Sequence, residues 1–214
     1  MELVISHVKK DFKNKPVLQD IELSAKKGEC IGILGGNGCG KTTLLSILAG
    51  VLKADGGSVC FNGKELLGNK EDCNEAVGHV PQGTPLFEEL TAKDNLRLWY
   101  EKKDMEKELE EGVLAMLGIP EFLNVQVSKM SGGMKKRLSI GCAVADRQPI
   151  LLLDDVFDKL DMTRISNLLQ MVSGNDFGQI FITDSNKVRM SGIVDGLTQD
   201  RAYFETVSGT FRRI

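Results

Sequence analysis

The spacing of apolar and polar residues predicts a chain of alternating strands and helices. Apolar and polar residues alternate through MELVISHVKKDF and KPVLQDIELSAKKGE, which is typical of two or three half-buried strands. The run CIGIL (30–34) predicts a buried strand that leads into a glycine-rich turn. Further strands are expected in GSVCFNGKEL, AVGHVPQ, ILLLD (150–154) and QIFIT (179–183), with a β-hairpin in YFETVSGTFRRI.

Helical spacing is found in four segments of the chain. They are KTTLLSILAGVL (41–52), the charged stretch 91–118, a stretch beginning near Ser131, and MTRISNLLQMV (162–172). The cluster Lys135, Lys136 and Arg137 is interpreted as a solvated helix face. The order of elements predicts a β-rich edge, an α/β core, a helical insert and then the α/β core again.

Composition narrows the classes of function. The 214 residues carry a net charge of −3, so no overall basic field is available for nucleic acid, and DNA is not expected as a partner. Five scattered cysteines without a Cys-x-x-Cys pair favour reduced thiols over disulfides or a zinc site. No apolar window reaches the ~18 residues that span a bilayer. The expectation is a soluble, cytoplasmic protein whose membrane role, if any, requires a partner.

The segment GGNGCGKTT fits the phosphate-loop pattern G-x-x-x-x-G-K-[ST] and lies between a predicted strand and a predicted helix. Lys41 is expected to contact the β- and γ-phosphates, and the Thr42 hydroxyl to contact Mg²⁺. Cys39 lies at a helix N-terminus beside a lysine, which favours a thiolate, while steric shielding is the alternative. The segment therefore predicts a site for a nucleoside triphosphate with Mg²⁺, formed by Gly35, Asn37, Gly38, Cys39, Gly40, Lys41, Thr42 and Thr43.

A second motif identifies a family. In SKMSGGMKKR, Ser131 opens a helix about 20 residues before the acidic strand LLLDDVFDKLD, and alone it is typical of a helix cap. Together with the phosphate loop and the acidic strand, in this order, the motif resembles the ATP-binding-cassette (ABC) superfamily. The resemblance implies one α/β domain, 1–214, with a P-loop core, a mixed sheet and an N-terminal antiparallel β-subdomain. Its expected parts are 1–81 (β-subdomain and P-loop core), 82–148 (helical subdomain) and 149–214 (C-terminal half of the core).

The resemblance also implies roles for residues outside the phosphate loop. Gln82, in GHVPQ, corresponds to the Q-loop residue that contacts Mg²⁺ and water and forms a hinge toward the helical subdomain. Phe12 corresponds to the aromatic residue that stacks on adenine, with Val17 nearby, and the alternative for Phe12 is an edge-strand core residue. Contacts across a dimer are implied for Ser131, Gly132, Gly133 and the D-loop residue Asp161.

These roles imply partners and a location. ABC ATPases of this kind form an ATP-dependent head-to-tail homodimer, or a heterodimer with a related subunit, that encloses two ATP molecules. The implied function is that of a nucleotide-binding subunit beside a transmembrane transporter subunit, at the inner face of the membrane.

The resemblance changes near Pro149. Residues 1–148 resemble a bacterial transporter ATPase, whereas 149–214 resemble the C-terminal part of RecF-type DNA-repair ATPases. A mosaic chain, natural or engineered, is one explanation, and drift of a transporter subunit is the other. The competing function is a RecF-like, DNA-associated ATPase, against which stand the acidic net charge and the lack of a long helical insertion.

The acidic strand raises a question about the rate of hydrolysis. Asp154 is expected to hold Mg²⁺, and Asp155 stands where transporter ATPases place the glutamate that polarises the attacking water. Aspartate is one methylene shorter, so slow hydrolysis is expected, and Asp155→Glu restores reach. Alternatively, the C-terminal segment is a matched set in which a glutamate crowds the site. Asp184 stands where the resemblance implies a histidine that faces the γ-phosphate. The alternative is that the Asp184 side chain faces solvent or caps the next turn.

Overall fold

The computed structural model describes residues 1–13, 15–157, 178–196 and 198–214. The alternating N-terminal segment forms the antiparallel strands β1 (Glu2–Phe12) and β2 (Lys15–Lys26), as predicted. Strands β4 (Gly56–Phe61) and β5 (Lys64–Glu65) pair beside them and complete a sheet of order β2-β1-β4-β5. Buried residues alternate with exposed ones along β2, so this sheet has one face on the core.

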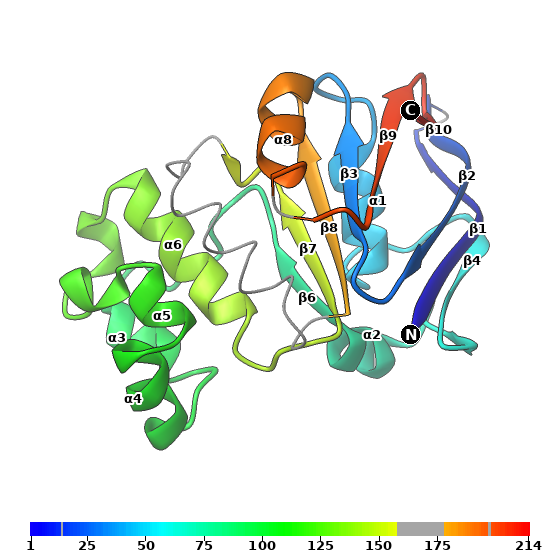
Figure 1. Cartoon of the computed structure of the whole chain (residues 1–214). Helices are drawn as coiled ribbons and strands as arrows, with labels where there is room; N and C mark the ends of the chain where they lie inside the picture. Colours follow the sequence, from blue (N-terminus) through cyan, green and yellow to red (C-terminus); the bar gives the residue numbers. More distant parts are fainter. Residues whose placement is uncertain (14, 158–177, 197) are drawn as a thin grey trace.

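A second, six-stranded sheet forms the centre of the molecule (Figure 1), in the order β10-β9-β3-β8-β7-β6. Strands from β9 to β6 run parallel, and only β10 is antiparallel to its neighbour. The mixed α/β class predicted from the sequence is therefore confirmed. The strands are β3 (Cys30–Leu34), β6 (Val77–Val80), β7 (Ile150–Asp154), β8 (Gln179–Asp184), β9 (Arg201–Val207) and β10 (Thr210–Arg213).

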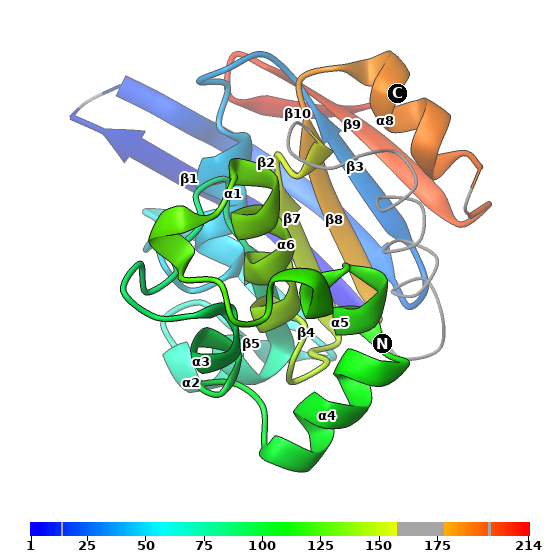
Figure 2. The same ribbon diagram turned by 90° about the vertical axis from the view of Figure 1, so that its left-hand side faces the viewer.

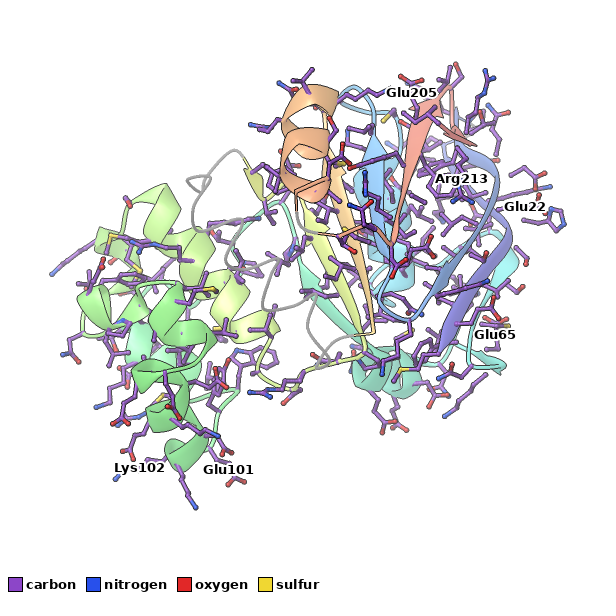
Figure 3. All side chains as sticks on the ribbon, in the orientation of Figure 1. Glu22, Glu65, Glu101, Lys102, Glu205 and Arg213 are labelled. Atoms are coloured by element: carbon purple, nitrogen blue, oxygen red, sulfur yellow. The ribbon has the colours of Figure 1, made fainter. Side chains whose placement is uncertain are left out.

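Helices cover the central sheet. Figures 1 and 2 show α3, α4, α5 and α6 grouped on one side of the molecule, with the β1–β2–β4 sheet on the opposite side. Glu101 and Lys102 lie at the tip of the helical group (Figure 3), where both are exposed. The helices and 3₁₀ turns are α1 (Lys41–Leu48), α2 (Lys70–Ala76), α3 (Ala92–Leu96), α4 (Lys102–Glu110), α5 (Val113–Met116), η1 (Ile119–Phe122), η2 (Val127–Lys129), α6 (Gly132–Ala143) and α8 (Lys187–Val194).

The central strands separate two hydrophobic clusters. Every residue of β3 and β7 is buried, which is typical of parallel strands covered on both faces. Because successive side chains of a strand point to opposite faces, Ile31 and Ile33 pack toward α1 and the first sheet, while Leu34 joins the cluster of α6 and α8. The same alternation in β7 places Leu152 in the cluster of Ile31 and Ile33, and Leu153 in the cluster of Leu34.

Several predicted elements differ in extent or were missed. Helix α1 ends at Leu48 rather than at residue 52, and Gly50 follows with a positive φ of 67° that does not continue a helix. Helices α2 and α8 were not expected, and the predicted helix 162–172 lies outside the described residues. The C-terminal hairpin is confirmed: Ser208 and Gly209 join β9 and β10 with φ values of 50° and 80°, which is typical of a two-residue hairpin turn. Among the described residues, none of the helices has the length and apolarity required to cross a bilayer.

Candidate functional site

The phosphate loop faces the acidic strand across one cavity. A pocket of about 330 Å³ opens at the carboxyl ends of β3, β7 and β8, where ligands bind in open α/β sheets. Predicted site residues from three distant segments of the chain meet there. The lining residues are Asn37, Gly38, Gly40, Lys41, Thr42, Thr43, Gln82, Asp154, Asp155 and Ser185.

The loop is shaped by glycine and anchored by its own lysine. Gly38 and Gly40 have φ values of 79° and 104°, which other residues adopt only with strain. Lys41 is buried, and its Nζ donates hydrogen bonds to the carbonyl oxygens of Gly35 (2.6 Å) and Gly36 (3.0 Å). The ammonium group is thus held inside the loop, beside the space where phosphate oxygens are expected.

The loop also rests on the C-terminal hairpin. A Cβ atom at Gly35 would collide with the side chain of Thr206 in β9, so this position requires glycine. The Thr206 hydroxyl donates to Cys39 Sγ, and Lys41 Nζ lies 3.8 Å from the same sulfur. Cys39 is therefore half-buried, on the hairpin side of the loop rather than on the wall of the cavity.

One hydroxyl orders both acids of the acidic strand. Thr183 Oγ1 donates to Asp154 Oδ1 (2.6 Å) and accepts from the backbone N–H of Asp155 (2.9 Å). Asp155 adopts a positive φ of 50°, and its Oδ2 accepts from Gln82 Nε2 at 3.1 Å. The side chains of Gln82 and Asp155, 73 residues apart, are in this way joined at the cavity wall.

The donor set fits a magnesium ion. Asp154 is 1% exposed, and its Oδ2 has no hydrogen-bond partner among the described residues, which leaves a buried carboxylate oxygen with unused capacity at the cavity. Carboxylate, hydroxyl and amide oxygens are the ligands that Mg²⁺ prefers. Asp154, Thr42 and Gln82 all line the cavity, so the residues expected to hold the metal are together.

Asp184 is not directed at the cavity. It is fully buried, which excludes the solvent-facing alternative, and Arg189 Nη2 and Nε donate to its two oxygens at 2.7 and 2.9 Å. Its Oδ1 also accepts from the backbone N–H of Asn186 at 2.9 Å, so the capping alternative holds. The next residue, Ser185, lines the cavity instead. Sequence reasoning missed Ser185 and Arg189, although the end of a central strand opposite a phosphate loop is a signal for Ser185.

The interpretation of the basic cluster as a solvated face was wrong for Lys136 and for Arg137, whose side chain is 12% exposed and lies over the Phe122 ring. The Lys136 side chain is 1% exposed, and its Nζ donates to the carbonyl oxygen of Pro81 at 2.7 Å. Burial lowers the pKa of Lys136 to about 8, against the opposing effect of the Asp154 and Asp155 carboxylates. Lys135, in contrast, pairs with the exposed Glu88 at 2.7 Å. The helix itself was predicted correctly. The prediction of which side of α6 faces the core was wrong.

The remaining predicted site residues lie outside the cavity. Phe12 is 45% exposed, with Lys10 Nζ 5.5 Å from its ring centroid, so the core alternative for Phe12 is wrong. Val17 lies beside the phosphate loop: its carbonyl oxygen is 3.0 Å from the position that a Cβ at Gly40 would occupy. Asp161 lies outside the described residues.

The Ser-Gly-Gly motif is at a separate, accessible surface. Ser131 caps α6, since its Oγ accepts from the backbone N–H of Met134 at 3.3 Å. Ser131 and Gly132 are exposed, and neither lines the cavity. Figure 1 shows α6 in the helical group, on the far side of β6 and β7 from α1. The motif and the phosphate loop of one chain therefore do not form a single site.

Comparison with known proteins decides the family. Residues 18–158 match the family model described as ABC transporter. This chain belongs to the ABC transporter family. It is an ABC-type ATPase domain, and domains of this type bind ATP.

The relatives of this ABC domain include ATP-binding proteins named for linearmycin resistance and for spermidine/putrescine import. The linearmycin resistance ATP-binding protein LnrL of Bacillus subtilis is 30% identical, over 86% of this chain and 61% of the relative. The spermidine/putrescine import ATP-binding protein PotA of Thermotoga maritima is 36% identical, over 78% and 46%. An uncharacterized ABC transporter ATP-binding protein of Rhizobium meliloti is 30% identical, over 90% and 74%. The matches to LnrL and PotA span less than two thirds of those relatives.

Solved structures share the fold along the whole chain. A dimeric ATP-binding cassette in a post-hydrolysis state, bound to ADP and Pi, superposes with a TM-score of 0.84 at 25% identity, covering 99% of this chain and 97% of that one. The ATP-binding subunit of an ABC transporter gives a TM-score of 0.84 at 22% identity, covering 100% and 90%.

Proposed function

We propose that this ABC domain binds Mg·ATP and hydrolyses it slowly as the nucleotide-binding subunit of a transporter. The supporting observation is the cavity in which Lys41 and Thr42 face Asp154, Asp155 and Gln82. Positive charge, a hydroxyl and two carboxylates on opposite walls are what phosphoryl transfer to water requires. Family membership supports the same assignment.

Each residue of the cavity has a proposed part. The Lys41 ammonium and the loop N–H groups bind the β- and γ-phosphates. Thr42, Asp154 and Gln82 would hold Mg²⁺, which would neutralise phosphate charge. Gln82 orients the attacking water, and Asp155 Oδ2 accepts its proton. Slow hydrolysis stays part of the proposal, because an aspartate stands at the position where the family resemblance implies a glutamate.

The proposed dimer completes two such sites. Phe12 stacks on adenine, with Val17 beside the loop, while Ser131, Gly132, Gly133 and Asp161 act across the interface on the nucleotide of the opposite subunit. The exposure of Ser131 and Gly132 supports this role. The proposed parts of the domain remain 1–81, 82–148 and 149–214. The mass of the purified chain in solution with Mg·ATP distinguishes the homodimer from a heterodimer, which requires the related subunit.

A transmembrane subunit is proposed to dock beside the Q-loop, at the cytoplasmic face. A groove of about 480 Å³ lies there between the core and the helical group, with lining residues that include His79, Trp99 and Gln148. Trp99 is 55% exposed, and buried His79 Nε2 and Gln148 Oε1 have no hydrogen-bond partner among the described residues. An amphipathic segment with a polar contact at its centre fits this lining.

The RecF-like alternative and the mosaic chain find no support in these comparisons. The match to the Rhizobium relative extends over 203 residues, so it continues beyond residue 148. No observation favours a DNA-associated function, and a mobility-shift assay with duplex DNA at low and high salt is expected to show no binding.

The test of the proposed function is Lys41→Ala. We expect ATP affinity to fall by at least about 10-fold, since a charge-assisted contact to phosphate contributes about 1.5–3 kcal/mol. Residual hydrolysis is expected to vanish while the unfolding temperature changes little. Titration calorimetry and steady-state ATPase assays measure both effects, with the exposed Lys53→Ala as the matched control. Equal ATP affinity in parent and variant overturns the assignment.

A further inference from the structure

We propose that Lys136 is a positioning residue: it ties helix α6, which begins at the Ser-Gly-Gly motif, to the Q-loop with Gln82 and to the end of β7 with Asp155. This inference rests on the proposed function, since it concerns the same ATPase site. Lys136 is not among the residues that line the cavity. Its effect on hydrolysis is therefore exerted through the backbone that it holds.

The ammonium group of Lys136 is at a junction of three carbonyl groups. Its Nζ donates to the carbonyl oxygen of Pro81 at 2.7 Å, and lies 3.4 Å from those of Gln82 and Asp154. An ammonium has three N–H donors, so each donor has one acceptor. Two of the acceptors belong to the Q-loop and the third to the end of β7, so one side chain of α6 joins both segments.

Those two segments carry the residues that meet at the cavity wall. Gln82 Nε2 donates to Asp155 Oδ2, and this contact requires the Q-loop and the end of β7 to keep a fixed distance. Asp155 directly follows the carbonyl group that Lys136 approaches, and its φ of 50° is a conformation that needs support from its surroundings. The three contacts of Lys136 Nζ are called the brace below. Without the brace, the segments that carry Gln82 and Asp155 would no longer be joined through α6.

The position of Lys136 in α6 connects the brace to the exposed Ser-Gly-Gly motif. Lys136 lies in the second turn of the helix that Ser131 caps. A helix is stiff over this length, so a shift of its N-terminus on contact with a second subunit moves the Lys136 Nζ as well. Helix α6 thereby transmits occupancy of the motif to the Q-loop and Asp155.

If Lys136 served only the stability of the fold, its substitution would change the free energy of unfolding rather than the rate of hydrolysis. A buried charge is costly, and replacement by an apolar residue of similar length is often neutral or stabilising. Lys136→Met is therefore expected to fold with a stability near that of the parent, yet to lose the brace. Its neighbour Lys135 provides the matched control, because Lys135→Met removes the same side chain from the same turn but only a surface pair with Glu88.

The experiment compares the parent with Lys136→Met, Lys136→Arg and Lys135→Met. We expect Lys136→Met to lower kcat by at least about 10-fold, because small misplacements of reacting groups have effects of up to about 10²-fold. ATP affinity is expected to stay within about 2-fold, since the phosphate loop is untouched. Lys136→Arg restores most of the rate, and Lys135→Met matches the parent. In a Gln82→Ala background, Lys136→Met adds little further loss, because the two residues act in one chain of contacts.

A second readout does not depend on activity. Amide hydrogen exchange of the nucleotide-free protein is expected to be faster in 81–90 of Lys136→Met than in the parent or Lys135→Met. Unchanged exchange there, or an unchanged kcat with an active parent, overturns the inference. If neither the parent nor Lys135→Met hydrolyses ATP, the proposed function fails while the exchange data still decide the brace. If Lys136→Met does not fold, Lys136→Gln, a shorter neutral donor, takes its place with the same expected outcomes.

Discussion

At the scale of single residues, the site depends on a few contacts with little redundancy. Thr183 is fully buried and contacts both acids. Its hydroxyl donates to the Asp154 carboxylate and accepts from the backbone N–H of Asp155. Asp155 keeps a left-handed conformation that aspartate tolerates better than most side chains. These two features favour the matched-set alternative for the acidic strand over the view that Asp155 is simply a shortened glutamate.

Asp155→Glu is accordingly expected to slow ATP hydrolysis by about 10-fold rather than accelerate it. The longer side chain must leave its contact with Gln82, and glutamate is less suited to a φ of 50°. Steady-state rates at saturating Mg·ATP test this, with Asp155→Asn as the variant that keeps the shape and loses the base. A faster Asp155→Glu enzyme supports the shortened-glutamate view instead.

Thr183→Val is expected to destabilise the protein by about 1–3 kcal/mol, although it replaces only a hydroxyl by a methyl group. The change leaves Asp154, whose Oδ2 already has no partner among the described residues, without the donor to its Oδ1. Urea unfolding measures the loss. Thr210→Val, at an exposed hydroxyl that donates to Val207, is the control and should cost less than about 0.5 kcal/mol.

At the scale of elements, strands with unbroken aliphatic runs were predictable and short helices were not. β3, β7 and β8 were located from their composition, because burial on both faces requires such runs. Helix α2 was missed because KEDCNEA has no long apolar face, although Asn69 caps it by accepting from the Asp72 N–H, a signal that sequence alone contains. The partner of Asp184 and the burial of Lys136 depend on how α8 and α6 pack, which local patterns do not specify.

Strand β6 contains a pH-sensitive position. Burial lowers the pKa of His79 below its ordinary value of 6.5, so between that value and the lowered pKa the unfolded chain binds a proton that the folded protein does not. Stability is therefore expected to fall as the pH drops below about 6.5, and His79→Gln to lose less than the parent over the same interval. Urea unfolding of both proteins at pH 7.5 and 5.5 measures the difference, and parallel losses contradict the prediction.

At the scale of the whole molecule, the arrangement separates two surfaces that the proposed function brings together only in a dimer. The phosphate loop lies at the central sheet, whereas the capped end of α6 lies in the helical group (Figure 1). The order of motifs made this division predictable from the family resemblance. The contacts within each surface were not predictable, because they join residues dozens of positions apart.

Gly132→Ala distinguishes a dimer role from a monomer role. Apart from its chain neighbours and the backbone of its own helix, no atom of the described residues lies within 4 Å of the Cβ position at Gly132, so alanine is expected to leave the monomer as stable as the parent. In the proposed dimer the added methyl group meets the nucleotide of the second subunit and lowers ATP hydrolysis. Light scattering with Mg·ATP, in an Asp155→Asn background that holds the nucleotide, is expected to show less dimer than the Asp155→Asn parent. The same dimer fraction in both argues against contact at this surface.

The contact between the phosphate loop and the C-terminal hairpin has a consequence for synthesis of the protein. Cys39 and Thr206 are 167 positions apart, and β3 is flanked by β8 and β9, which both come late in the chain. At about 5–20 residues per second, the loop precedes Thr206 by roughly 10–30 seconds on the ribosome. Until β8 is synthesised, late in that interval, β3 lacks both neighbours, and the nascent chain depends on chaperones or on the first sheet for protection. Acquisition of nucleotide binding during translation therefore marks the arrival of β9, rather than of the motif that contacts the phosphates.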